Sequence, residues 1–126
     1  MKLRIKGNSI RLRLRQPDVA LAAAGKRLEI TTDFGASTLR LVLIGQDAPG
    51  LSVTFADNAI VVMAPQKVLS AWAASDEVGL YGEQSTSTGE VLTIAIEKDF
   101  RCLDRSHADD DQAGTYPHPA IKASKS

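Results

Sequence analysis

Residues 1–15, MKLRIKGNSIRLRLR, contain two runs in which apolar and basic side chains alternate, with Gly7-Asn8 between them. Alternation with a period of two is typical of a strand that buries one face. A Gly-Asn pair between two such runs is typical of a two-residue turn. The stretch therefore predicts a β-hairpin over residues 2–15. One face of this hairpin carries a row of basic side chains, namely Arg4, Lys6, Arg11, Arg13 and Arg15.

The elements that follow this hairpin recur later in the chain in the same order. A short helix opens at Pro17 and ends before Gly25, because proline favours the first turn of a helix and glycine its end. Two more alternating strands follow. After the turn cluster at residues 46–50 the series begins again, with a second helix that opens at Pro65. Each half therefore predicts strand–strand–helix–strand–strand.

The two halves also match residue by residue. Asn8-Ser9-Ile10 lies 50 positions before Asn58-Ala59-Ile60, and at the same spacing Leu28 corresponds to Val78. With three residues inserted in the later loop, the apolar residues of the last strands also correspond, which pairs Leu39, Leu41 and Leu43 with Leu92, Ile94 and Ile96. A match at a fixed spacing indicates an internal repeat.

Neither half is large enough to bury a core alone. We expect a first repeat over residues 1–48 and a second over residues 49–100 to share one barrel, which leaves no exposed sheet edge. The predicted fold class is α+β, mostly β, with a closed antiparallel barrel formed by two ββαββ repeats and two short helices. Since both repeats lie on one chain, the barrel closes as an intramolecular pseudo-dimer and a monomer suffices. Residues 101–126 predict an acidic and polar C-terminal tail.

The chain of 126 residues has 15 Lys and Arg and 15 Asp and Glu, so its net charge is zero. Residues 1–50 hold nine of the basic residues and four of the acidic ones, which gives +5 there and −5 in the remainder. Either the two parts attract each other, or the basic part faces an anionic partner. No apolar stretch approaches ~20 residues, so no membrane span is expected. One cysteine and the lack of a signal-peptide pattern favour a cytoplasmic protein.

The run Lys6-Gly7-Asn8-Ser9, followed by Leu12-Arg13-Leu14, a short helix and a hairpin, resembles the AbrB/MazE family over residues 2–98. The resemblance implies a swapped-hairpin barrel in which two ββαββ units interlock, and a DNA-binding transcription regulator or an antitoxin. The chain departs from the family pattern at Arg15, where the family has a proline. In the second half, Met63 stands where the first half has Arg13.

The whole chain also resembles an uncharacterised bacterial family of short proteins. These open with an Ile-Lys-Gly-Asn-Ser-Ile-Arg-Leu-Arg-Leu run, which is Ile5 to Leu14 in this sequence. They close with three short patterns, which lie here at Glu97–Phe100, Cys102–Arg105 and Tyr116-Pro117. This second resemblance covers most of the chain and implies no function.

The basic side chains of the first hairpin are the main functional candidates. Like charges on paired strands repel each other, so something must offset the repulsion. Acids on neighbouring strands could form a charged lattice with them, for which the candidates are Glu29, Glu83 and Glu97. Alternatively, the cations contact phosphates. No aromatic side chain is expected on this face, which argues against a stacking platform for single strands.

These observations predict a non-enzymatic binding protein, in its sharper form an AbrB-like regulator that uses the basic hairpin to bind double-stranded DNA or an acidic protein. The alternative is an antitoxin-like or accessory module that binds a partner protein through its tail. The third hypothesis is a metal-dependent enzyme, with Cys102 and His107 as ligands beside the acids of the tail. No cofactor is expected, since no catalytic constellation stands out.

Overall fold

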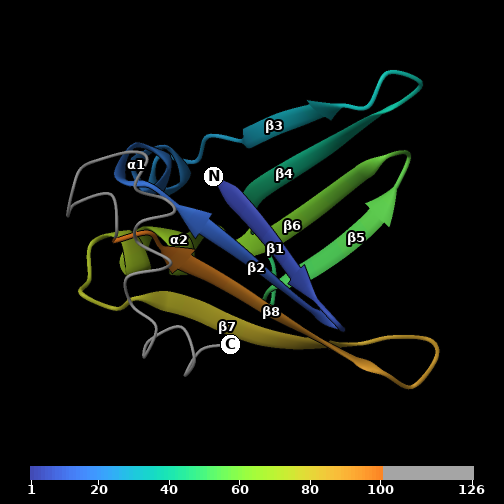
Figure 1. The fold of residues 1–126 in the computed structure, drawn as a ribbon. Helices are drawn as coiled ribbons and strands as arrows, with labels where there is room; N and C mark the ends of the chain where they lie inside the picture. The colour runs from blue at the N-terminus through green and yellow to red at the C-terminus, as the bar shows by residue number, and fades with distance from the viewer. Residues whose placement is uncertain (101–126) are drawn as a thin grey trace, which may run out of the picture.

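The computed structural model describes residues 1–100 (Figure 1). The predicted acidic and polar tail, residues 101–126, lies outside the described residues. Eight strands and two helices follow one another along the described part, in the order β1 (Lys2–Lys6), β2 (Ser9–Leu14), α1 (Gln16–Ala23), β3 (Leu28–Asp33), β4 (Thr38–Gln46), β5 (Ser52–Ala56), β6 (Ala59–Pro65), α2 (Gln66–Ala73), β7 (Gly79–Ser85) and β8 (Val91–Lys98). The prediction of a mostly-β member of the α+β class is confirmed.

The strands form two four-stranded sheets, and each sheet combines one hairpin from the first half of the chain with one from the second. We call the sheet with the order β1-β2-β8-β7 sheet A, and the sheet with the order β3-β4-β6-β5 sheet B. In both sheets the two hairpins meet through their second strands. The central pairs, β2 with β8 and β4 with β6, are therefore parallel.

The prediction of a closed antiparallel barrel is wrong on two points. Residues 1–100 form two separate sheets with four edge strands, and each sheet has a parallel pair at its centre. Alternation of apolar residues identifies a strand and its buried face, but it carries no information about which strand lies beside it. The antiparallel assumption came from the hairpins, which are antiparallel only within themselves.

The register of the central pairs repeats between the two sheets. Ile10 lies opposite Ile94 in sheet A, and Leu41 lies opposite Ile60 in sheet B. Ile10 and Ile60 are 50 positions apart, and Leu41 and Ile94 are 53 apart, as the sequence match requires. The same spacing holds for β1 and β5, because Leu3 pairs with Leu12 as Val53 pairs with Val62. The two sheets are therefore related as approximate copies.

The predicted match of Leu28 with Val78 is off by two residues. Leu28 pairs with Leu43, and the equivalent of Leu43, which is Ile96, pairs with Leu80. Leu28 therefore corresponds to Leu80 at a spacing of 52. A shift of two residues keeps every side chain on the same face of the strand, so the alternation pattern could not reveal it.

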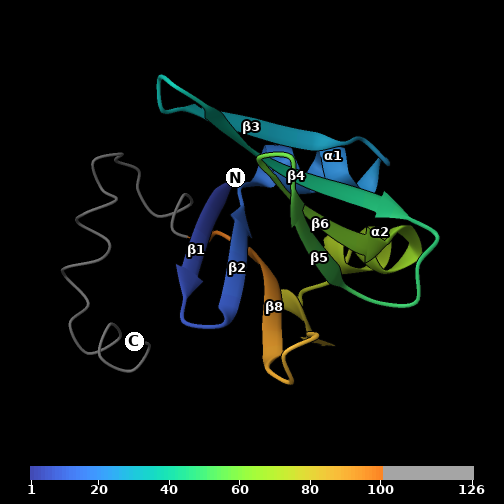
Figure 2. The same ribbon diagram turned by 90° about the vertical axis from the view of Figure 1, so that its right-hand side faces the viewer.

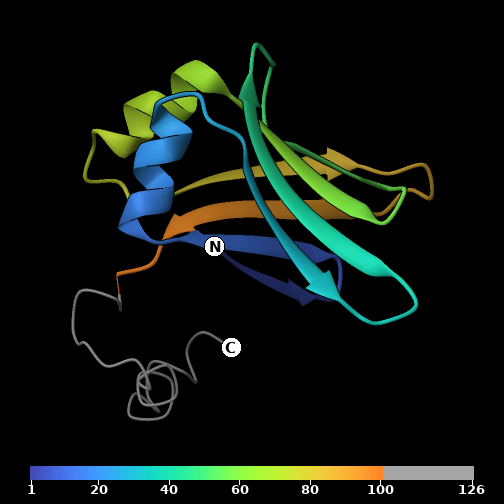
Figure 3. The same ribbon diagram turned by 90° about the horizontal axis from the view of Figure 1, so that it is seen from above.

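Both helices lie together at one end of the sheets, and the strands extend away from them (Figure 3). The helices contact each other through the side chains of α2. Gln66 Nε2 donates a hydrogen bond to the Ala22 carbonyl at 3.0 Å, and Ser70 Oγ donates to the Ala23 carbonyl at 3.0 Å. The Ala22 carbonyl also accepts from the Gly25 N–H at 3.1 Å, and the bond from Ser70 supplies a donor to the Ala23 carbonyl at the last residue of α1. Trp72, which is 2% exposed, joins the core formed by the inner faces of both sheets.

The two places where sheet A could meet sheet B differ from each other. On one side, the edge strands β5 and β7 lie next to each other and are joined through Gln84 and Val53. On the other side, β1 and β3 separate with distance from the helices (Figures 1 and 2). No backbone hydrogen bond joins β1 to β3 within residues 1–100. We refer to the first as the closed seam and to the second as the open seam.

None of the helices in the described part of the chain combines the length and the apolar character that crossing a membrane would require.

Candidate anion-binding face

The outward surface of sheet A carries a group of cations that comes from the first hairpin. Because the inward positions of β1 and β2 are apolar, the alternate positions face away from the core. Lys2 lies opposite Arg13, and Arg4 lies opposite Arg11. We call this surface the basic face and define it by Lys2, Arg4, Lys6, Arg11 and Arg13.

Arg15, which the sequence analysis placed on the same face, is not part of the sheet. The strand β2 ends at Leu14, and Arg15 is the N-cap residue of α1. Its backbone N–H donates to Asp18 Oδ2 at 3.4 Å, as in a capping box. The alternation of the sequence continues through Arg15, but the chain has already turned into the helix.

Glu97 is the carboxylate that balances the second strand of the basic face. It lies opposite Arg13 on the parallel neighbour β8. Its Oε1 is 3.6 Å from Arg11 Nε and 3.8 Å from Arg13 Nε. The Glu97 side chain is only 14% exposed, so these ion pairs are partly shielded from water. Its position between two guanidinium groups reduces the repulsion that the sequence predicts for this hairpin.

The other two acids proposed for a charged lattice lie elsewhere. Glu29 belongs to sheet B, where it contacts Arg27 at 3.0 Å and Arg40 at 3.7 Å. Glu83 lies on β7, opposite Thr93, and is exposed. Of the three candidates, only Glu97 contacts the basic face through an ion pair within residues 1–100.

The first strand of the basic face is the more exposed one. Arg4 is exposed and forms no ion pair with another described residue. Lys2 Nζ lies 3.6 Å from Asp99 Oδ2, and Asp99 is buried, with its N–H donating to the Leu14 carbonyl at 2.9 Å. The cations of β1 therefore stand at the edge of sheet A, while those of β2 are held by Glu97.

Tyr81 also lies on this surface, contrary to the expectation that no aromatic side chain would. It pairs with Ala95, which in turn pairs with Arg11, so all three side chains share one row across the sheet. Its hydroxyl donates to Glu97 Oε2 at 2.9 Å, although the residue as a whole is 63% exposed. Tyr81 could not be placed on this surface from the sequence, because the pairing of β8, its hairpin partner, with β2 was not predicted.

The environment of the phenol changes its acidity. Partial burial raises the pKa of Tyr81 above its ordinary value of 10.0, and the hydrogen bond to Glu97 and the negative charge of that carboxylate raise the pKa further. The nearby Arg11 opposes this rise of the pKa. Tyr81 therefore stays a neutral hydrogen-bond donor at physiological pH, and it helps to hold Glu97 in position for the arginines.

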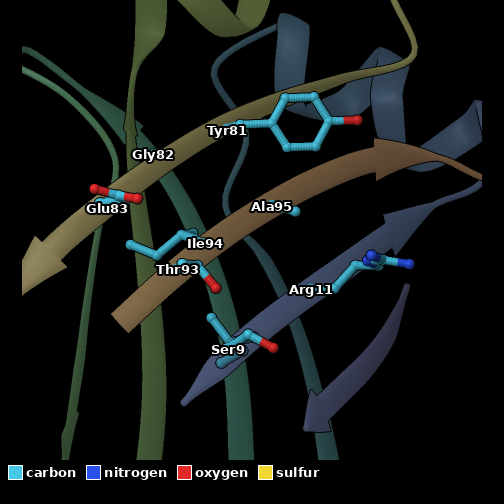
Figure 4. A pocket seen from close by; sticks show the side chains of 9 residues that line it. Ser9, Arg11, Tyr81, Gly82, Glu83, Thr93, Ile94 and Ala95 are labelled. Carbon is cyan, nitrogen blue, oxygen red and sulfur yellow. The ribbon is translucent and has the colours of Figure 1, made fainter. Parts of the chain in front are cut away.

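A hollow of about 480 Å³ lies on the outward surface of sheet A, lined by residues of β2, β8 and β7 (Figure 4). Its floor is formed by Thr93 and the short side chain of Ala95 on β8. Tyr81 and Glu83 border it on the β7 side, and Arg11 borders it on the β2 side. The hollow can receive a group that projects from a bound partner, with Arg11 available to an anionic end.

The weaker metal hypothesis falls on residues that the structure does not describe. Cys102 and His107 lie outside the described residues. Within residues 1–100, no three His, Cys, Asp or Glu side chains gather closely enough to hold a metal ion.

Comparison with known proteins places the chain in a family without giving it an activity. No curated protein and no solved structure matches it. None of the comparisons names AbrB or MazE. A family model described as a family of unknown function, DUF7009, matches residues 1–120. The match extends over both halves and most of the remaining residues, and the chain therefore belongs to the DUF7009 family.

Proposed function

We propose that this protein is a non-enzymatic binding protein whose basic face contacts the phosphates of double-stranded DNA, in the manner of an AbrB-like regulator. The observation that carries the proposal is the excess of positive charge on this face. Arg11 and Arg13 share one carboxylate, that of Glu97, Lys2 Nζ lies 3.6 Å from the buried Asp99, and Arg4 forms no ion pair with another described residue. A polyanion would relieve the repulsion that remains and release its own counterions on binding.

The arrangement of the cations suits a phosphate backbone. Arg4 and Lys6 are exposed at the edge of sheet A, where an approaching duplex meets them first. Arg11 and Arg13 are about one third exposed and are positioned by Glu97, so they keep donors available on one side. An arginine that is already oriented loses less conformational freedom when it binds a phosphate.

The topology supports the AbrB-like part of the proposal. The resemblance to the AbrB/MazE family implies interlocked ββαββ units, and here each sheet combines hairpins from both halves of one chain. The second half lacks the cations of the first. The positions equivalent to those of the basic face carry uncharged side chains, namely Ser52, Thr54, Ala56, Val61 and Met63. DNA is therefore expected to contact sheet A alone, so that one protein binds asymmetrically.

The proposal is tested by measuring the binding of random-sequence duplex DNA over a range of salt concentrations. Four to five neutralised phosphates imply a slope of roughly −4 in a plot of log K against log salt. In the double variant Arg4→Ala with Lys6→Ala, the slope should become less steep by about two units. Each cation that is removed means that about one counterion fewer leaves the DNA on binding.

The matched control is Lys26→Ala with Lys67→Ala, which removes the same charge from exposed positions outside sheet A. This control should keep the slope of the parent protein. An equal loss of slope in both double variants would show that net charge, and not the basic face, governs binding. Absence of DNA binding at low salt would remove nucleic acid as the partner.

A further inference from the structure

The closed seam shows how the edges of the two sheets can be joined. Gln84 of β7 reaches across to β5, where its Nε2 donates to the Val53 carbonyl at 2.9 Å and its Oε1 accepts from the Val53 N–H at 2.8 Å. The side chain thus takes the place of a neighbouring strand for Val53. Gly82 allows the close approach, because a Cβ there would lie 3.3 Å from the Cβ of Leu51.

The open seam lacks both of these features. By the register of the two sheets, Thr32 stands where the second half has Gln84, and Ile30 stands where it has Gly82. A threonine side chain is too short to reach a neighbouring strand as the glutamine does. A branched isoleucine occupies the space that glycine leaves free. These two differences leave β1 and β3 apart.

The outer edge of β1, beside which no strand of residues 1–100 lies, therefore offers backbone groups and apolar side chains together. Leu3 has the position of Val53 in the register, so its N–H and C=O point outward from the β1–β2 pair, as those of Val53 do. Val53 is buried under the closed seam, whereas Leu3 is half-buried. On the same inner side, Ile5 is 58% exposed and Ile30 is 42% exposed.

We propose that the outer edge of β1 binds an extended segment of a partner protein in which apolar residues alternate with acidic ones. Such a segment would add a fifth strand to sheet A through the backbone of Leu3. Side chains of an added strand alternate between the two faces of the sheet. The apolar ones would cover Ile5 and Ile30, and the acidic ones would lie beside the cations of β1, namely Lys2, Arg4 and Lys6.

The charges on β1 argue against a second copy of the chain as the occupant. Pairing of two β1 edges would bring the cations of both strands side by side on the same face of the joined sheet. Like charges at such short distances are destabilising, and lysine on an edge strand is a known protection against self-association. An acidic segment turns the same charges into an attraction.

The proposal goes beyond DNA binding because it uses the backbone edge of β1, whereas DNA would use the outward side chains. We would measure the binding of a short synthetic peptide in which valine alternates with glutamate, by fluorescence anisotropy, with a scrambled peptide of the same composition as the control. Both Leu3→Pro and Leu3→Ala lose the leucine side chain, but only Leu3→Pro also removes the outward backbone N–H. A proline is tolerated at an edge position whose N–H faces solvent.

Leu3→Pro should weaken peptide binding by roughly tenfold relative to Leu3→Ala, the factor that corresponds to one lost hydrogen bond of about 1.4 kcal/mol. DNA binding should be equal in these two variants, which separates the failure of this proposal from a failure of the DNA proposal. Equal binding of the ordered and scrambled peptides, or equal affinities of the two variants, would overturn the docking site.

A second variant does not depend on the folding of Leu3→Pro. Ile30→Gly with Thr32→Gln introduces the residues of the closed seam, Gly82 and Gln84, into the open one. This variant should melt at a higher temperature than Ile30→Gly alone and should lose peptide binding. Peptide binding that appears only after residues 101–126 are removed would assign the edge to the chain's own C-terminal segment. Dimers that Leu3→Pro abolishes would assign it to a second copy, and either result overturns the proposal.

Discussion

The side chain of Gln84 hydrogen-bonds both backbone groups of Val53, at 2.8 Å from the N–H and 2.9 Å to the carbonyl. Val53 is 8% exposed, so these bonds satisfy backbone groups that water reaches poorly. One glutamine thus joins two sheets whose edge strands are not otherwise paired with each other.

The first prediction concerns this bridge. Gln84→Thr introduces the residue type of the open seam and leaves the backbone groups of Val53 without their partner. The free energy of unfolding should fall by about 1–3 kcal/mol, the range for a buried polar group that loses its hydrogen bond. Urea denaturation followed by circular dichroism measures this change.

The matched control for the bridge is Gln46→Thr. Gln46 is exposed, and its Nε2 contacts only the Met63 sulfur at 3.2 Å among the hydrogen bonds of the described residues. This variant should stay within ~0.5 kcal/mol of the parent protein. If both variants lose the same stability, the seam is not held by Gln84.

The second prediction concerns Glu97. Glu97→Gln removes the negative charge that Arg11 and Arg13 share, at 3.6 and 3.8 Å. The stability should fall by about 1 kcal/mol, the upper end for partly exposed ion pairs. DNA affinity should rise, since the basic face gains net positive charge and both arginines become available to phosphates.

Glu83→Gln is the control, because it makes the same change of charge on the same side of sheet A without breaking an ion pair of the described residues. It should leave the stability unchanged and raise DNA affinity less than Glu97→Gln does. A Glu97→Gln variant with unchanged salt dependence and unchanged stability would contradict the balancing role of this carboxylate.

The third prediction concerns the ionisation of Tyr81. Its pKa is raised above 10.0 by partial burial and by Glu97. A phenol with a raised pKa in the folded state stabilises the protein fully below the unfolded pKa and loses that contribution as pH rises through the folded pKa. Unfolding measured above pH 10.0 should therefore show a loss of stability with increasing pH that Tyr81→Phe diminishes.

Ultraviolet absorbance of the phenolate gives a direct reading of the same group. Tyr81→Phe identifies its signal, since the chain has a second tyrosine, Tyr116. In Glu97→Gln the titration of Tyr81 should move to lower pH, because the charge that opposes the phenolate is gone. A titration of Tyr81 that is identical in both backgrounds would rule out this coupling.

The fourth prediction concerns the contact between sheet B and α2. Gly45 on β4 lies directly beneath this helix, and a Cβ there would collide with Gln66 Oε1 and approach Leu69 Cδ1 to 2.9 Å. Gly45→Ala should cost about 1–3 kcal/mol, as expected for overpacking. It should also displace Gln66 from the Ala22 carbonyl. Thermal melting compares it with Gly50→Ala, which meets nothing within 4 Å and should be neutral or slightly stabilising.

Local patterns of the sequence predicted much of this fold, since they depend on near neighbours in the chain. The turn at Gly7, whose φ is +55°, and the helix that follows Pro65 are both present. The spacing of 50 that matches Ile10 with Ile60 is present in the register of the strands. These features follow from backbone preferences of glycine and proline and from the burial of alternate side chains.

Pairing between distant strands could not be predicted in the same way. The parallel pair β2–β8 places Glu97 beside Arg13, and β7 then places Tyr81 in the row of Arg11. Nothing in the local pattern of either segment distinguishes this neighbour from another. From the sequence, Glu97 was one of three candidate acids for the basic face, and Tyr81 was not expected there. Choosing Glu97 and finding Tyr81 both require the order of the strands in the sheet.

The strand order also has a consequence for how the chain folds during its synthesis. Sheet B comes entirely from residues 28–65, so all its strands are available once the middle of the chain has left the ribosome. Sheet A must wait, because β2 pairs with β8 and the first hairpin emerges long before its partner. Until Val91–Lys98 appears, the backbone of β2 at Leu12 and Leu14 has no neighbouring strand on that side. A prematurely terminated chain would therefore expose this apolar strand and be prone to aggregate.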